Sequence, residues 1–128
     1  AELLANAGLD WLVIEMEHTA VDWVDVEKIM MAMNRTETIP IVRVPPSDLF
    51  AIQKALDIGA MGVLVPMIKT VSEVEAMVQV TRYPPQGKRG FGPLRASRYT
   101  IDYKSHLEDA NDNTLVILLL ETKVIRRQ

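Results

Sequence analysis

Four apolar runs of the sequence each end at a residue that could do chemistry or shape a site. Those residues are Glu17-His18, Arg43, Pro66 and Glu121. A histidine beside a carboxylate suits proton transfer near neutral pH, because its pKa range is right and the carboxylate can orient the ring. A lone histidine in a surface loop would give the same pattern, so the pair alone leaves both interpretations open.

Arg43 and Glu121 each have two possible roles, one structural and one catalytic. A partly buried guanidinium at Arg43 needs an anionic partner. That partner is a carboxylate of the chain (Asp57, Glu15 or Glu17) or a substrate oxygen on which enolate charge develops. The carboxylate of Glu121 either pairs with an arginine or binds a hard cation such as Mg²⁺ or Mn²⁺.

The apolar runs alternate with helical patterns that would position these residues. Strands are expected at 11–16, 39–44, 62–67 and 114–120. Helix starts are expected at Asp22, Ser47 and Thr70, with a short helix at 102–109. This alternation, with short connections, predicts a parallel sheet with helical cover.

A barrel explains the pattern better than an open sheet. Parallel barrel strands are continuous apolar runs with their chemistry at the carboxyl ends, and no G-x-G-x-x-G turn follows any strand. A complete barrel takes about 250 residues. We therefore expect residues 1–128 to be one α/β domain, a partial (β/α)8 TIM barrel with four parallel strands. Both ends look truncated, since 1–8 resembles a helix already begun and 121–128 another one beginning.

Composition narrows the function classes. The formal net charge of −3 and the lack of a basic stripe argue against nucleic-acid binding. The absence of cysteine excludes disulfides, thiolate metal sites and a cysteine nucleophile, and it suits a cytoplasmic location. The longest apolar stretch, 115–120, is far shorter than the roughly 20 residues of a membrane span.

A long loop follows Tyr83-Pro84-Pro85 and mixes glycine, proline, arginine and aromatic residues. Loops of this length are usually functional or disordered. Arg89, with Arg95 and Arg98, could bind an anionic substrate tail, because arginines suit carboxylates and the glycines allow movement. Packing against another subunit would explain the same residues.

Several motifs in order, AGLDWLVIEMEH, VRVPPSD, LDIGAMGVLVPMIKT, TRYPPQGKRGFGPLRASRY and ET, carry a family resemblance. The chain resembles the class II pyruvate aldolases of the HpcH/HpaI family, typified by 4-hydroxy-2-oxoheptanedioate aldolase of aromatic compound catabolism. The resemblance extends to about Lys123. It implies a metal-dependent TIM barrel, usually hexameric, that reversibly cleaves 4-hydroxy-2-oxo acids into pyruvate and an aldehyde.

The resemblance also implies roles for individual residues. His18 matches the catalytic histidine, which acts through solvent on the 4-hydroxyl proton, and Arg43 matches the arginine that steadies the enolate oxygen. Glu15 stands where the family usually has an aspartate paired with that histidine. Asp57 matches an aspartate near the arginine and the subunit boundary. Glu17 matches the acidic neighbour of the histidine, with a supporting role in substrate binding.

The resemblance assigns Glu121 to the first of two carboxylates that hold a divalent metal, Mg²⁺ or Mn²⁺ with Co²⁺ as a further candidate. The second carboxylate belongs to a later strand that this chain does not contain. Leu119 stands where relatives often carry a glutamine. A leucine cannot hydrogen-bond the substrate or a metal-bound water, so that support for the metal site is lost. We therefore expect the chain alone to be inactive. The alternatives are a non-catalytic half-barrel scaffold, or a citrate-lyase-like or malyl-CoA-lyase-like enzyme, which would not usually carry the E-x-E-H arrangement.

Overall fold

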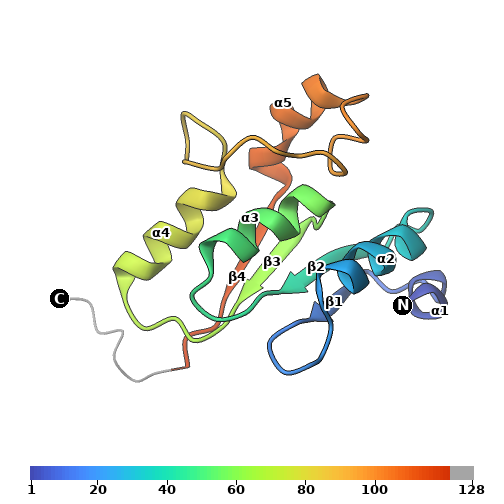
Figure 1. Ribbon diagram of the computed structural model, residues 1–128, viewed down its shortest axis with the longest axis horizontal. Coiled ribbons are helices and arrows are strands. Elements are labelled where there is room, and N and C mark those ends of the chain that lie inside the picture. Colours follow the sequence, from blue (N-terminus) through green and yellow to red (C-terminus); the bar gives the residue numbers. More distant parts are fainter. Residues whose placement is uncertain (122–128) are drawn as a thin grey trace.

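The computed structural model describes residues 1–121, so the helix expected at 121–128 lies almost entirely outside the described residues. Four parallel strands form one sheet in sequence order, which confirms the predicted fold class (Figure 1). The strands are β1 (Trp11–Glu15), β2 (Ile39–Arg43), β3 (Gly62–Val65) and β4 (Leu115–Leu118). The helices are α1 (Glu2–Asn6), α2 (Trp23–Met33), α3 (Leu49–Ile58), α4 (Val71–Thr81) and α5 (Tyr103–Asn113).

The register of the strands separates two faces of the sheet. Ile14 pairs with Val42, and Val42 with Val63, so these side chains share one face. They are buried in a core with Ile52 of α3 and Met77 of α4. Glu15 pairs with Arg43, one residue out of phase with the core side chains, and these two therefore point to the opposite face. In a closed barrel this second face would be the interior.

Side-chain caps begin α2 and α4 as predicted. Asp22 and Thr70 each accept hydrogen bonds from the first turn of the helix that follows, within complete capping boxes. The predicted cap Ser47 is wrong. Asp48 caps α3 instead, because its backbone is extended while Ser47 is left-handed with φ 56°.

The predicted strand ends run slightly past the observed ones, and α5 is longer than predicted. Met16 and Val44 still donate backbone hydrogen bonds to the neighbouring strand, which explains the longer apolar runs. A tertiary contact stabilises the additional turn of α5, because the Asn111 side chain makes two hydrogen bonds with the backbone of Tyr83. That tertiary contact has no local sequence signal.

The predicted loop is an ordered segment, residues 82–102, which we call the strap. It folds back over the end of α4, where Lys88 N donates to Gln79 O at 2.7 Å and Arg89 N to Arg82 O at 2.8 Å. A Cβ atom at Gly87 would lie only 2.4 Å from Arg82 O, so the close approach requires glycine. Over residues 1–121, no helix has the length and apolarity to cross a membrane.

Candidate functional site

The predicted chemistry-bearing residues at the ends of β1 and β2 meet at the carboxyl edge of the sheet. Glu15 and Arg43 are opposite each other in the register, on the face without helical cover. Glu17 and His18 follow in the loop after β1. This loop lies at the end of the sheet away from the strap and α5 (Figure 1).

Arg43 is held by two carboxylates. Its Nη1 lies 3.0 Å from Glu15 Oε2, and its Nη2 contacts Glu17 Oε2. The Arg43 side chain is 19% exposed and that of Glu17 only 7%. Of the partners considered for this guanidinium, Glu15 and Glu17 are therefore the ones it contacts. Because one guanidinium faces two carboxylates, the cluster is net negative.

Glu15 also shapes the loop that carries the histidine. Its Oε1 accepts from the amides of Glu17 at 2.7 Å and His18 at 3.3 Å. Burial raises the pKa of Glu15, but these two amides and the Arg43 guanidinium outweigh it and hold the pKa below the ordinary value. Glu15 thus contacts His18 through the backbone amide and not through the ring.

The His18 ring pairs with Glu17. Its Nε2 lies 3.3 Å from Glu17 Oε2, and the His18 side chain is 70% exposed. Glu17 therefore bridges the imidazole and Arg43 with the same carboxylate oxygen. The arrangement places a proton-exchanging group in contact with solvent beside a fixed cation.

Glu121 lies at the same edge of the sheet, beyond the end of β4. Its Oε2 accepts a hydrogen bond of 2.9 Å from the backbone N–H of Met67, which follows β3. Met67 has φ 59°, which is rare for a residue other than glycine. The sequence gives no signal for this backbone donor beyond the preceding Pro66, which ends the apolar run.

The residues described here do not form a complete metal site by themselves. Within residues 1–121 no group of three or more His, Asp or Glu side chains is placed to hold an ion. Glu121 offers one carboxylate, with one oxygen engaged by Met67. A divalent cation therefore stays a prediction that needs ligands from outside this part of the chain.

Asp57 and Arg89 lie at the opposite edge of the sheet. Asp57 is in the last turn of α3, and the chain then enters β3 beside the start of β2, where Met61 N donates to Pro40 O at 2.9 Å. Arg89 Nη2 is 2.8 Å from Asp57 Oδ1, and its side chain is only 2% exposed. Within one chain, the structure therefore does not bring these two residues together with Arg43. Their proposed catalytic and substrate-binding roles stay predictions.

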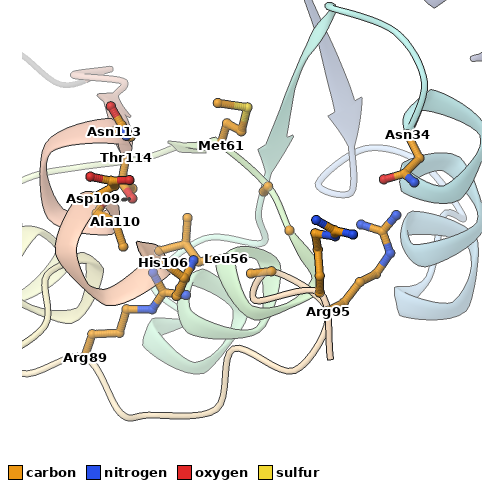
Figure 2. A pocket seen from close by; sticks show the side chains of 14 residues that line it. Asn34, Leu56, Met61, Arg89, Arg95, His106, Asp109, Ala110, Asn113 and Thr114 are labelled. Atoms are coloured by element: carbon orange, nitrogen blue, oxygen red, sulfur yellow. Dashed lines mark hydrogen bonds between the residues drawn. The ribbon is translucent and has the colours of Figure 1, made fainter. Parts of the chain in front are cut away.

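A cavity of about 300 Å³ adjoins that ion pair, between the strap, α3 and α5. Figure 2 shows Arg89 beside His106 in its wall, with Arg95 on the opposite side. The sequence interpretation did not single out His106. Its ring and the Tyr83 hydroxyl are brought together over 23 residues by the fold, which leaves no local motif.

The parallel sheet, its helical cover and the polar cluster at its carboxyl edge define a partial (β/α)8 barrel with a candidate active site. The chain belongs to the HpcH/HpaI aldolase/citrate lyase family, whose family model matches residues 1–124. The family expected from the motifs is thereby confirmed.

Individual relatives agree with this assignment. The chain is 41% identical over 123 residues to 2-dehydro-3,6-dideoxy-6-sulfogluconate aldolase of Pseudomonas putida, covering 95% of this chain and 48% of that protein. It is 40% identical over 125 residues to 4-hydroxy-2-oxo-heptane-1,7-dioate aldolase of Shigella sonnei, covering 96% and 47%. The crystal structure of an HpcH/HpaI aldolase/citrate lyase family protein from Burkholderia cenocepacia matches with a TM-score of 0.87 and 35% identity, covering 96% and 50%. The chain thus spans about half the length of the curated relatives it matches.

Proposed function

We propose that the chain carries the arginine and histidine half of an aldolase site, which reversibly cleaves 4-hydroxy-2-oxo acids into pyruvate and an aldehyde. The single observation that carries this proposal is Arg43, fixed by Glu15 and Glu17 on the inner face and adjoining His18. Family membership and the aldolase names of the relatives support the reaction class.

Arg43 would stabilise the charge that the reaction develops. When the C3–C4 bond breaks, its electron pair remains on the pyruvate fragment as an enolate, while C4 becomes the aldehyde carbon. A guanidinium that is already oriented stabilises this charge without reorganisation at the moment of reaction. Glu15 and Glu17 supply that orientation.

His18 would handle the proton that leaves the 4-hydroxyl group. Its exposed ring can exchange the proton through a water molecule, and Glu17 keeps the ring beside the site. Protonation of the enolate at C3 then yields pyruvate. In the synthetic direction the same groups act in reverse.

The net negative charge of the cluster favours a further cation. An anionic 2-oxo acid would meet two carboxylates and one guanidinium, so an additional positive charge is needed to bind it. We propose Mg²⁺, Mn²⁺ or Co²⁺, with Glu121 as one ligand and the others from outside residues 1–121. Such an ion acts as a Lewis acid when bound.

We further propose that the chain functions in a homo-oligomer, with a hexamer as the expected state. Large apolar side chains near Asp57 support this, since Phe50 is 84% and Leu94 61% exposed, and both line one surface cavity with Asp57. Exposed apolar patches of this kind mark interaction surfaces. Light scattering on the purified protein measures the state directly.

The catalytic proposal is tested with a chimera. The chain is joined to the carboxyl-terminal half of the Pseudomonas putida relative, and pyruvate release from a 4-hydroxy-2-oxo acid is followed with Mn²⁺ present. We expect pyruvate from the chimera, at least tenfold less from its Arg43→Lys variant, and none at an enzymic rate from the chain alone.

The outcomes separate the alternatives. Release of acetyl-CoA from malyl-CoA or citryl-CoA, without pyruvate release, would support the lyase alternative. A folded chimera that is inactive and binds no pyruvate would support the non-catalytic scaffold. Either result overturns the aldolase proposal.

A further inference from the structure

A partly buried polar and aromatic cluster packs the strap against α5 at the edge of the sheet opposite the candidate site. Tyr83, 4% exposed, has its hydroxyl 3.3 Å from His106 Nε2. The Arg89 guanidinium lies over the Tyr83 ring at 4.5 Å. Phe91 packs on Tyr83 at 6.0 Å between ring centroids and on Tyr103 at 5.5 Å.

His106 is the member of this cluster whose charge changes near neutral pH. Its ring packs edge-on against Tyr83, with centroids 5.9 Å apart. As a neutral ring it can accept a hydrogen bond from the Tyr83 hydroxyl at Nε2. A protonated ring can only donate there, so the hydrogen bond would have to reverse, with the Tyr83 oxygen accepting and its hydroxyl proton left without this acceptor.

The charged groups around His106 also oppose its protonation. The Arg89 guanidinium comes from the strap, and its only carboxylate partner within residues 1–121 is Asp57 of α3. Arg95 and Arg98 of the strap line the same cavity, with Asp109 of α5 as its acidic lining residue. Burial first, and then Arg89, lower the pKa of His106, while Asp57 acts weakly in the other direction.

We propose that His106 is a proton-sensitive latch, which holds the strap against α5 when neutral and releases it when protonated. Protonation places a second cation beside Arg89 in a partly buried cluster and removes the acceptor for the Tyr83 hydroxyl. Release of the strap would expose the Arg89–Asp57 ion pair and the Tyr83 ring that lies against the guanidinium. The proposal is independent of the aldolase activity, because it concerns the opposite edge of the sheet.

The sign follows from proton binding. A histidine with a lowered pKa binds fewer protons in the closed state than in the open state, so acid favours opening. The effect begins as the pH falls through the ordinary histidine value of 6.5 and grows until the closed state also becomes protonated. Above that range the latch stays closed.

Hydrogen exchange tests the latch, because two strap amides are hydrogen-bonded: that of Lys88 to Gln79 O of α4, and that of Arg89 to Arg82 O at the start of the strap. Exchange is measured at pH 7.5 and 5.5 on the full chain, corrected for the intrinsic pH dependence, with peptides of α2 as the internal reference. We expect strap opening to increase roughly threefold or more at pH 5.5 relative to α2. His106→Gln should abolish this increase. His18→Gln, at the only other histidine of the chain, should retain it.

An NMR pH titration of the unsubstituted chain tests the latch without relying on the His106→Gln variant, which could pack poorly. The His106 ring signal and the strap amide signals are followed by NMR in the unsubstituted chain. We expect both to change with one midpoint, below the ordinary histidine value of 6.5. The proposal is overturned if the strap amides do not follow His106, or if His106→Gln folds normally and keeps the pH-dependent exchange.

Discussion

The two edges of the sheet each contain an arginine bound to carboxylates, but in different surroundings. Arg43 at the carboxyl edge contacts Glu15 and Glu17 and is 19% exposed on the face without helical cover. Arg89 at the amino edge contacts Asp57, is 2% exposed and is covered by the Tyr83 ring. Both have an Nε–H without an acceptor within residues 1–121, so this orphan donor does not distinguish them.

Exposure separates the two arginines by role. A guanidinium fixed at an open edge can still approach a ligand, whereas one that is 2% exposed and packed on an aromatic ring contributes first to holding the strap in place. The difference shows that ion-pair geometry alone does not identify a functional arginine. Substitutions at the two edges should therefore affect different properties.

Arg89→Met should have the largest effect on stability. It leaves Asp57 without its cation beside a buried cluster, and removal of one partner of a buried pair costs about 3 kcal/mol. Arg43→Met removes the more exposed of the two guanidinium groups, 19% against 2%, and should cost less, about 1 kcal/mol. Urea unfolding measures both free energies. An equal loss for the two variants would remove the distinction between the edges.

Gly87→Ala should have the next largest effect on stability. It changes the packing of the strap and leaves all charged groups in place. The new Cβ would lie 2.4 Å from Arg82 O and 2.5 Å from Gln79 O, so the strap must shift. We expect a loss of about 2 kcal/mol in the free energy of unfolding. The matched control is Gly8→Ala, which has φ 81° and no atom within 4 Å and should cost about 1 kcal/mol from backbone strain alone. A smaller loss for Gly87→Ala than for Gly8→Ala would contradict the close approach.

The sequence predicted those parts of the molecule that depend on local chemistry. Apolar runs identified the four strands, and the Asp22 and Thr70 caps were confirmed because capping side chains act within three residues. The contacts of Arg43 with Glu15 and Glu17 were also among those considered. They follow from parallel strands of matched length, whose ends lie at one edge.

Contacts that depend on tertiary structure could not be predicted in this way. The Tyr83–His106 contact joins residues 23 positions apart, and the longer α5 depends on Asn111 binding back to Tyr83. Ser47 was expected as a cap because its type is right, but its left-handed backbone excludes that role. Spacing could not show that Arg89 is buried, because burial depends on where the strap folds.

The two edges should also respond to different ranges of pH. The pKa of Glu15 is lowered, so its contribution is present above the ordinary glutamate value of 4.5 and is lost as the pH falls through the folded-state value. Glu15→Gln should cost about 1 kcal/mol at pH 7 and less at pH 3. His106→Gln should instead change the pH dependence of stability from about pH 6.5 downward. Thermal unfolding from pH 3 to 8 measures both dependences, and a common pH range would mean that the edges are coupled.

The smallest expected effect concerns the Met67 backbone at the carboxyl edge. A left-handed non-glycine residue costs about 1 kcal/mol or more, whereas glycine costs roughly 0.5–1 kcal/mol in lost chain entropy. Met67→Gly should therefore raise the free energy of unfolding by only about 0.5 kcal/mol. Because the Met67 side chain is 43% exposed, Met67→Ala should leave stability nearly unchanged and serves as the control. If Met67→Gly destabilised the protein by more than the control, strain would not be the relevant property, and the bond from Met67 N–H to Glu121 would depend on a rigid backbone at this position.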